Sequence, residues 1–600
     1  MTSHLLLITL GPIQDFIAQA RRTRDLWYGS HLLSELGRCA ARALVDGKGH
    51  LVFPALEAGD PELRRCRKPL REETKAPPLS IANKLLAEVP SGIDPEVLAR
   101  DVREAVQAFW RDDIGANIKR KCDGLLAKGI DDTWREQLDS FLEFTASWAP
   151  LDDGHSSYST ARTKLEKAVA GRKNLRDFGQ WTHLRGNVPK SSLDGARETV
   201  LRRANAREQS LTRRYRIDRN EQLDAIGLIK RAGGEPEQFV PIINVGLVPW
   251  LERAKSECPR QFEKLLKACE QLGLSQVRRS DLPCAALFPF NASIVLRSRW
   301  ASVFDEEGLD ENPDEWGRQH VGPLLKQLGE PSSYVVCLVA DGDGMGHAID
   351  SLKSASEHRE LSRRLAKFAS DARTIVEHEH MGSLVYAGGD DVLAFLPLSH
   401  ALACADALRK NFAGHMQGPT LSVGIGVGHV MEAMGDLLDI GRAAERLAKG
   451  KDLPIEMRRN ALGVIFDKRS GGQSTWRARW EQWNGDPTGR LLEDVQLLSH
   501  RLSSRKVYDI DRLLRSMPSP KNVGSDLRWH QVLEFEIRNA LARNYGGDGG
   551  LTPDQVNLPL PMKYEDLHRE ASSWIARMKI ARMLGDGNGQ TSQYGLEVHS

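Results

Sequence analysis

The chain has 600 residues, of which 40% are hydrophobic and 27% charged, and its formal net charge at pH 7 is +2. This composition excludes a disordered polar chain, and the nearly balanced charge excludes an indiscriminate binder of polyanions. At roughly 150 residues a domain, the length predicts about four domains. The sequence shows no leader pattern and no apolar run of about 18 residues, so we expect neither secretion nor a membrane span.

The N-terminal segment predicts a buried strand followed by a helix. Residues 5–10 form a strand-like apolar run, and apolar side chains then recur at helical spacing at Ile13, Phe16, Ile17 and Ala20. Arg21, Arg22 and Arg24 follow at the next turn. They form either a solvated helix face or a contact to RNA or phosphate, and the sequence leaves both readings open.

An arginine-rich stretch follows a long segment of helical character, roughly residues 92–180. Residues 202–219 contain seven arginines against only two acidic residues. Such a run tracks an RNA backbone in some proteins and covers the solvated face of a helix in others. The residues that we name as candidate RNA contacts are Arg202, Arg203, Arg213 and Arg214.

Two acidic motifs follow buried strands in the second half of the chain. Residues 334–340 read as a fully buried strand that runs into Asp341, Gly342 and Asp343, and a helical pattern follows at 361–376. Residues 384–396 then form two apolar runs around a Gly-Gly-Asp-Asp tip. Glycines allow a tight turn there and the close approach of a polyphosphate.

The two motifs together predict a site for metal ions and a nucleotide. Asp390 and Asp391 repel each other in an apolar hairpin unless a cation or solvent neutralises them. Asp341, at the end of a neighbouring strand, can join them around two Mg²⁺ or Mn²⁺ ions, with Asp343 as a further candidate ligand. Taken singly, either motif also fits an ordinary polar turn, and the remaining ligands of a calcium loop are missing.

The order of elements predicts a ferredoxin-like palm. A helix at 403–412, a strand at 421–427, a helix at 436–449 and a strand at 461–466 complete a β-α-β-β-α-β unit with an additional helix and strand. Glycines alternate through residues 424–428, which leaves room for a ligand or a second backbone. After residue 470 the apolar spacing is mainly helical and predicts a C-terminal bundle.

These motifs resemble those of a known family. The Asp-Gly-Asp-x-Met-Gly motif at 341–346 and the Gly-Gly-Asp-Asp motif at 388–391 are similar to those in the large palm/cyclase subunit of type III CRISPR RNA-guided effector complexes. The run at 10–30 resembles the opening of that subunit in the type III-B (Cmr) branch. Residues 83–87 and 459–462 also resemble stretches of this family.

The resemblance implies an α+β fold with two ferredoxin-like, nucleotidyl cyclase-like palms. The implied domains are a first palm with a helical insertion at 1–200, a mainly helical inter-palm region at 201–331, a catalytic palm at 332–470 and a helical bundle at 471–600. Many relatives begin with a His-Asp nuclease domain, but this sequence has no His-Asp dipeptide, so we do not expect DNA cleavage. The Cys-x-x-Cys zinc site of relatives is replaced by residues 190–195, so we expect no zinc.

The resemblance also implies a function. It predicts a cytoplasmic nucleotidyltransferase that polymerises ATP into cyclic oligoadenylates when target RNA pairs with the guide RNA. Its catalytic residues are Asp341, Asp390 and Asp391, and its ATP-binding residues are Gly342, Gly388, Gly389 and Lys449. The implied partners are the other Cmr-type subunits, above all the small subunit and the subunit that binds the 5′ end of the guide, with no membrane.

Three alternatives remain open at the level of sequence. The chain is a catalytically silent scaffold of the same complex, an enzyme that joins AMP to another acceptor, or an enzyme that makes a cyclic dinucleotide. Diguanylate cyclases share the palm, but their hairpin usually reads Gly-Gly-Asp/Glu-Glu-Phe, and they do not need the N-terminal half of this chain. ATP turnover, tested against GTP, separates these alternatives.

Overall fold

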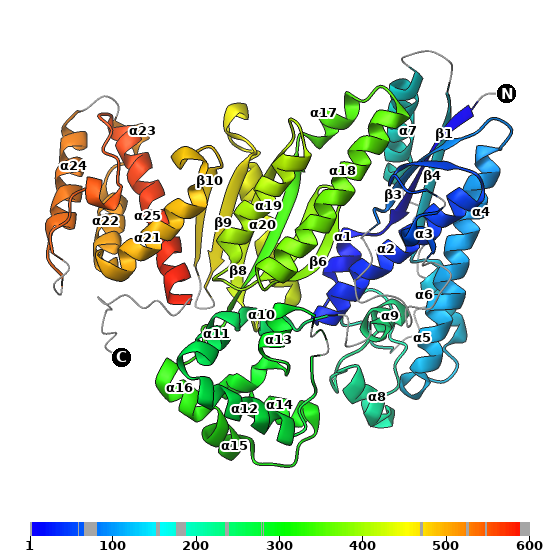
Figure 1. The fold of residues 1–600 in the computed structure, drawn as a ribbon, viewed down its shortest axis with the longest axis horizontal. Coiled ribbons are helices and arrows are strands. Elements are labelled where there is room, and N and C mark those ends of the chain that lie inside the picture. The colour runs from blue at the N-terminus through cyan, green and yellow to red at the C-terminus, as the bar shows by residue number, and fades with distance from the viewer. Residues whose placement is uncertain are drawn as a thin grey trace.

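The computed structural model describes residues 3–57, 59–64, 81–151, 157–175, 188–234, 239–277, 279, 281–468, 472–523, 527–545 and 549–587. Within them the chain forms two β-sheets covered by helices, one group of helices beneath the second sheet, and another at its outer edge (Figure 1). This arrangement is the α+β architecture that the sequence predicts. The domain boundary predicted between residues 470 and 471 lies outside the described residues.

The first sheet has four antiparallel strands in the order β2-β3-β1-β4. These strands are β1 (Ser3–Gly11), β2 (His50–Phe53), β3 (Lys84–Val89) and β4 (Glu143–Leu151). The central β1 is apolar on both faces, because Leu6 and Ile8 pack in the core that includes α2 (Thr23–Asp46), and Leu5 and Leu7 pack with α7 (Ser157–Asn174).

Strand β4 lies within the stretch for which the sequence predicts only helices. It is an edge strand whose side chains are mostly half-buried, so it lacks the continuous apolar run that marks a central strand. The remaining helices of this half are α1 (Gln14–Ala18), α3 (Pro61–Arg64), α4 (Pro95–Ala108), α5 (Ala116–Lys121), α6 (Asp131–Asp139), the π-helix η2 (Phe109–Gly115) and the 3-10 turn η3 (Asp123–Leu125).

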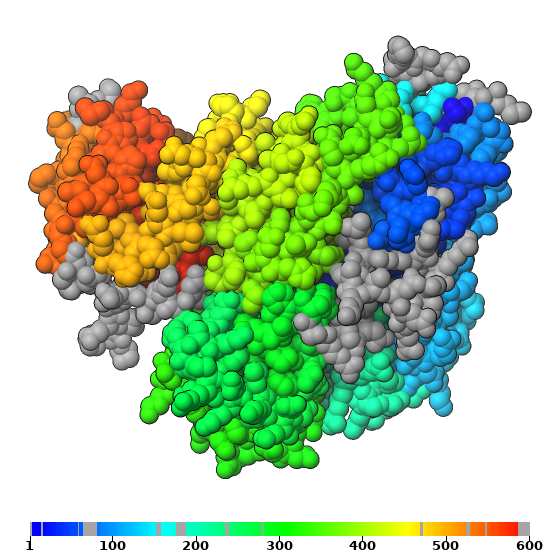
Figure 2. Space-filling view, viewed as in Figure 1, coloured from blue at the N-terminus to red at the C-terminus, as the bar shows by residue number. Residues whose placement is uncertain are grey.

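The inter-palm region is a set of short helices, several of which begin with a proline in the first turn, where its missing N–H costs no hydrogen bond. Figure 2 shows α11 to α16 as a lobe beneath the second sheet. The helices are η4 (Ala204–Ala206), α8 (Gln209–Arg214), α9 (Ala225–Gly233), α10 (Ile242–Gly246), α11 (Val248–Glu257), α12 (Pro259–Gln271), α13 (Pro283–Leu287), η6 (Ala292–Val295), η7 (Arg297–Arg299), α14 (Trp300–Glu307), α15 (Pro313–His320) and α16 (Gly322–Leu328).

The second sheet has six strands in the order β10-β9-β8-β5-β7-β6. These are β5 (Tyr334–Asp343), β6 (Ser383–Gly388), β7 (Asp391–Leu396), β8 (Thr420–His429), β9 (Ala461–Asp467) and β10 (Gln473–Arg479). Its helices are α17 (Met345–Asp350), α18 (Ala355–Thr374), the π-helix η8 (Ile375–Glu379), α19 (Ala401–His415), α20 (Met434–Lys449) and η9 (Ile455–Met457). Strand β5 lies between β7 and β8 and is antiparallel to both, so the palm predicted from the sequence is confirmed.

Helix α20 lies unusually close to the second sheet because glycines line its path. A Cβ on Gly424 would lie 2.1 Å from the backbone nitrogen of Glu445, and one on Gly426 would lie 2.5 Å from that of Gly441. On β9, a Cβ on Gly463 would lie 2.4 Å from the backbone oxygen of Ala444. The alternating glycines therefore make room for a second backbone, which is one of the two uses that the sequence predicts.

The C-terminal helices share a core with the second sheet. Leu491, Ile537 and Trp574 belong to the same apolar cluster as Val464 and Trp476 of strands β9 and β10. The elements are η10 (Trp483–Gly485), α21 (Pro487–His500), α22 (Ser504–Ser516), α23 (Pro520–Val523), α24 (Leu527–Ala542), η11 (Asp554–Val556) and α25 (Tyr564–Gly587). Across the described segments, none of the helices combines the length and apolar character that crossing a membrane requires.

Candidate active site

The two acidic motifs meet where β5 ends beside the β6–β7 hairpin. Ala340 pairs with Val392, so the next residues along the two strands, Asp341 and Asp391, lie side by side. Gly389 adopts a φ of 66° at the tip, a left-handed conformation that glycine takes without strain. Opposite the tip, a Cβ on Gly342 would lie 2.6 Å from Oδ2 of Asp390. The predicted convergence of Asp341, Asp390 and Asp391 is thus present in the fold.

Gly342 and Gly388 leave space for neighbouring side chains. Gly342 leaves space for Asp390 and for Met345, whose Cγ would lie 2.9 Å from an added Cβ. An added Cβ on Gly388 would lie 2.2 Å from the hydroxyl oxygen of Tyr386. Gly388 therefore accommodates a ring of its own strand, and its ATP-binding role stays a prediction, as does that of Gly389.

The hairpin acids oppose each other's ionisation. Burial, followed by the charge of Asp341, raises the pKa of Asp390 to about 6. Burial also raises the pKa of Asp391, and the hydrogen bond between Asp391 and Asp341 and the charge of Asp390 act in the same direction. Carboxylates held together in this way carry more negative charge than their surroundings compensate. Ionisable groups perturbed by such neighbours are typical of functional sites.

Lys449, the last residue of α20, is the cation that faces these acids. Its Nζ donates to Oδ2 of Asp341 and to the backbone oxygen of Gly342 at 3.3 Å, and lies 3.1 Å from Oδ1 of Asp343. Burial lowers the pKa of Lys449, but the hydrogen bond to Asp341 and the charge of Asp343 outweigh it, so the pKa is raised. The lysine is therefore held charged at the carboxylate site.

Asp343 is fully engaged by the protein. Its Oδ2 accepts hydrogen bonds from Thr420 Oγ1 at 3.0 Å, Ser422 Oγ at 2.8 Å and the backbone N–H of Asn460 at 2.9 Å. Its Oδ1 faces Lys449, and only 3% of the side chain is exposed. Because both oxygens have partners, Asp343 anchors β8, β9 and Lys449 around the site, whereas Asp341 is 36% exposed.

Sequence reasoning missed Glu445 of α20. This half-buried carboxyl group has a raised pKa because of its burial and the negative charge of Asp341, with Lys449 acting in the opposite direction. Its spacing of four residues from Lys449 on one helix was a usable signal. Thr420 and Ser422 gave no such signal, because only the β5–β8 register, in which Thr420 pairs with Asp343, brings them to the site.

The donor chemistry of the site fits a hard divalent cation. Within the described residues, no three His, Cys, Asp or Glu side chains are already grouped as a metal-binding set. However, Asp341, Asp390 and Asp391 offer only carboxylate oxygens, the ligands that Mg²⁺ and Mn²⁺ prefer. The pKa values of Asp390 and Asp391 are raised by burial and by the negative charge of the neighbouring acids, which a bound cation would offset. Lys449 already supplies part of that positive charge.

The arginine-rich stretch divides into structural and exposed residues. Arg202 donates to the backbone oxygens of Leu126 and, at 3.3 Å, of Asp123, and Arg207 donates to the backbone oxygen of Arg202 at 2.9 Å. By contrast, the side chains of Arg203, Arg213 and Arg214 are exposed. Of the four candidate RNA contacts, these last three therefore remain accessible to a ligand, whereas Arg202 holds the loop in place.

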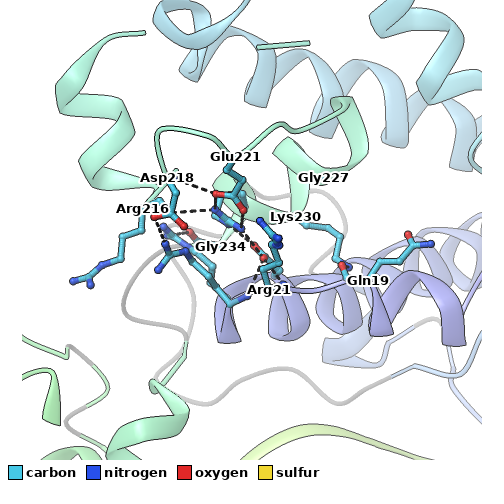
Figure 3. Close-up of polar contacts among 12 residues, drawn as sticks. Gln19, Arg21, Arg216, Asp218, Glu221, Gly227, Lys230 and Gly234 are labelled. Carbon is cyan, nitrogen blue, oxygen red and sulfur yellow. Dashed lines mark hydrogen bonds and ion pairs between the residues drawn. The ribbon is translucent and has the colours of Figure 1, made fainter. Parts of the chain in front are cut away.

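The N-terminal arginines surround a buried ion-pair network (Figure 3). Arg231 of α9 donates to both oxygens of Asp25 of α2, at 2.6 and 2.9 Å, and to both oxygens of Glu221, at 2.9 and 2.8 Å. Arg24 is buried and donates to the backbone oxygens of Arg214 and Gly234. Arg24 is thus a structural residue, a role that the sequence did not indicate for it.

The fold and the site together define a palm-type protein with a carboxylate cluster on its central strands. Two family descriptions match the chain: "Cas10/Cmr2, second palm domain" over residues 334–462 and "CRISPR-associated protein Cmr2, N-terminal" over residues 5–114. In these two segments the chain is similar to the Cas10/Cmr2 family. The first match spans the strands and helices that carry Asp341, Asp390, Asp391 and Lys449.

Individual relatives agree with this assignment. The CRISPR system Cmr subunit Cmr2 of Pyrococcus furiosus is 24% identical over 640 aligned positions, which cover 90% of this chain and 69% of that protein. A type III-B Cmr-beta structure in the apo state superposes with a TM-score of 0.65 at 14% identity, covering 98% of this chain and 82% of the other. The corresponding structure bound to cognate target RNA gives 0.64 at 14% identity, covering 98% and 83%. These two likenesses show a shared fold.

Proposed function

We propose that the chain is the large subunit of a type III RNA-guided effector complex and that its second palm joins ATP molecules into cyclic oligoadenylates when target RNA binds. The observation that carries this proposal is the convergence of Asp341, Asp390 and Asp391 beside Lys449. The resemblance to this family supports the RNA-guided setting, since the matched Pyrococcus protein is a Cmr subunit and a structure of similar fold is of a Cmr-beta complex bound to cognate target RNA.

The residues of the site suit nucleotidyl transfer. Two Mg²⁺ or Mn²⁺ ions bound by Asp341, Asp390 and Asp391 would neutralise phosphate charge and make the 3′-hydroxyl of ATP a usable nucleophile. We expect Lys449 to exchange Asp341 for a phosphate oxygen, because its charged Nζ is already poised there. Asp343 keeps Lys449 in reach while this happens. Positioning and charge neutralisation suffice for this reaction, so no protein nucleophile is needed.

The test compares assembled complexes supplied with ATP, Mg²⁺ and complementary RNA. We expect Asp390→Asn/Asp391→Asn to reduce nucleotide product by about 10³-fold or more, because it removes two of three metal carboxylates. Asp436→Asn/Asp439→Asn is the matched control, since these two exposed aspartates lie at the opposite end of α20. Mass spectrometry identifies the product as a ring or another AMP conjugate. Equal product from both variants contradicts the proposal, and a silent wild-type complex that still binds RNA favours the scaffold alternative.

We also propose that Arg203, Arg213 and Arg214 contact the RNA of the complex. Exposed guanidinium groups that pair with phosphates make binding salt-dependent, with a slope of about 0.7 for each contact to a single strand. We expect Arg203→Gln/Arg213→Gln to weaken RNA binding and to flatten that slope by about 1.4 units, which is about 0.7 for each of the two contacts removed. Arg318→Gln, an exposed arginine of α15, is the control. An unchanged salt dependence of RNA binding would mean that these arginines form a solvated surface and do not contact the RNA.

A further inference from the structure

Helix α17 follows the first acidic motif directly and has little packing of its own. Gly344, with a φ of 76°, turns the chain from β5 into α17. The helix has only six residues, and Met345 is its one buried side chain. A helix this short is marginal without external contacts. Its position must therefore come mainly from what holds its two ends.

The far end of α17 is held by a residue of the first palm. Arg162 of α7 is 2% exposed, and its Nη1 donates to the backbone oxygen of Ile349 in the last turn of α17. Its Nη2 donates to Oδ1 of Asp350 at 3.0 Å. The guanidinium thus satisfies a carbonyl at a helix C-terminus, where the helix dipole also favours a positive charge. Arg162 and Ile349, which are 187 residues apart in sequence, thus join the two palms at this contact.

The near end of α17 touches the carboxylate site. The side chain of Met345 packs on Gly342, where an added Cβ would lie 2.9 Å from Met345 Cγ and 2.6 Å from Asp390 Oδ2. Met345 and Asp390 therefore share the space over Gly342. A shift of α17 along its axis displaces Met345 and, with it, the surface against which Asp390 rests.

The seam beside α17 is not filled by side chains. A hollow of about 520 Å³ lies along α7, lined by Ser159, Arg162, Thr163, Glu166, Lys167, Ala170 and Asp350. Ile349 of α17 packs on the core of the second palm, and the hollow leaves the side of α17 at Asp350 open toward α7. The hydrogen bonds of Arg162 are therefore the contacts by which α7 restrains the end of α17.

We infer that Arg162 is a positioning residue for the active site, through which the first palm sets the geometry of the carboxylates in the second. This inference rests on the proposed function, because it names how the same site is held and regulated. Any movement of α7 reaches Asp390 through α17 and Met345. The first palm carries no part of the carboxylate cluster, but the position of its helix α7 would affect the reaction rate.

Arg359 provides a matched comparison within the same interface. It lies on α18 and donates to the backbone oxygen of Leu51 at 3.0 Å and to Glu88 Oε2 at 2.5 Å. Like Arg162, it joins the two palms through one carbonyl and one carboxylate. Unlike those of Arg162, its two hydrogen bonds go to β2 and β3 and not to α17. Its loss weakens the interface without releasing the helix that follows Asp343.

The experiment measures ATP turnover by the assembled complexes carrying Arg162→Met or Arg359→Met. We expect Arg162→Met to lower kcat by about 10-fold to 100-fold, because small displacements of reacting groups have effects of this size. KM for ATP should stay within about threefold, since the triphosphate contacts are unchanged. Arg359→Met should leave kcat within about threefold. Arg162→Lys should recover part of the rate, because one amine can still reach the Ile349 carbonyl.

Hydrogen exchange gives a second readout that does not depend on activity. In Arg162→Met, the amides of residues 342–350 should exchange faster than in wild type, and in Arg359→Met they should not. Unchanged exchange there, or equal loss of kcat in both variants, overturns the inference. If wild type makes no product, the proposed function fails, but the exchange rates still decide the role of Arg162. If Arg162→Met does not fold, Arg162→Lys is measured in its place.

Discussion

Two groups of charged side chains in this protein, one buried and one partly exposed, differ in their balance of charge. In the network of Asp25, Glu221 and Arg231, one guanidinium binds both acids, and all three side chains are at most 1% exposed. Burial alone raises the pKa of Asp25, but the charge and hydrogen bonds of Arg231 outweigh it and lower that pKa. At the carboxylate cluster the pKa values of Asp390 and Asp391 are raised instead.

This difference distinguishes charged residues that stabilise the fold from charged residues that can bind a ligand. Arg231 connects α9 to α2 because each of its donors has a fixed acceptor. Lys230 is the second cation beside Asp25, so two basic groups offset the two acids of the network. Lys449 faces more acids than it can neutralise, so the cluster retains affinity for a further cation. The two groups therefore differ in exposure as well as in charge, because Asp341 and Asp391 reach the solvent and the side chains of Asp25 and Glu221 do not.

Breaking the balanced network should have the largest effect on stability. Arg231→Met leaves Asp25 and Glu221 buried without their common cation, and we expect the free energy of unfolding of this region to fall by about 3–5 kcal/mol. Arg216→Met, which removes half-exposed pairs with Glu306 and Glu307, should cost about 1 kcal/mol or less. Native-state hydrogen exchange of α2 and α9 measures both. Equal losses of stability in Arg231→Met and Arg216→Met would show that burying the ion pairs of Arg231 contributes no additional stability.

A buried histidine between the palms should make the stability of the protein depend on pH. His358 of α18, whose Nδ1 lies 2.8 Å from the hydroxyl of Tyr158, has its pKa lowered to about 4 by burial and by the charge of Arg162. Between the ordinary value of 6.5 and about 4, the unfolded chain binds a proton that the folded chain does not. Stability should therefore fall as pH falls through this window, by up to about 3 kcal/mol.

The histidine's contribution is isolated by substitution. His358→Gln should remove this part of the pH dependence, whereas His50→Gln, a change at an exposed histidine of β2, should leave it intact. Thermal unfolding at pH 7 and pH 4.5 measures the difference. The same pH dependence in all three proteins would place its source elsewhere.

Neutralising the carboxylate cluster should have the smallest effect on stability, and we expect it to stabilise the protein where the other changes destabilise it. Without divalent ions, Asp390→Asn/Asp391→Asn removes repulsion, so we expect the stability of the second palm to stay equal or to rise by about 0.5–2 kcal/mol. Added Mg²⁺ or Mn²⁺ should raise the unfolding temperature of wild type but not of the variant. A variant that is destabilised as strongly as Arg231→Met would mean that these acids hold the fold together.

Much of the second palm could be predicted from sequence, because its signals are local. The apolar run at 334–340 and the turn glycines at 388–389 specify β5 and the hairpin without reference to distant residues. Strand β10 was not predicted, because it is an edge strand in which only Trp476 and Ala478 are buried, so it lacks a continuous apolar run. The same reasoning applies to the edge strand β4.

The partners of the charged residues could not be predicted. Arg231 and Asp25 are 206 residues apart, and no local pattern distinguishes Arg231 from the exposed arginines of the run at 202–219. Likewise, Lys449 was named from the family resemblance, and its contact with Asp341 depends on how closely α20 lies on the sheet. Such pairings belong to the tertiary structure, which the sequence specifies only as a whole.

The glycine-lined contact beneath α20 bears on how this domain can evolve. At Gly424, Gly426 and Gly463 the backbone of the helix lies against the sheet, and a methyl group already exceeds the available space. We therefore expect any amino-acid substitution at these positions to be unfavourable. In a saturation-mutagenesis screen these glycines would be as intolerant as the aspartates, although none of them would touch a nucleotide. Positions in this domain that tolerate no substitution are therefore of two kinds: those where the backbone of α20 lies against the sheet, and those that take part in the chemistry.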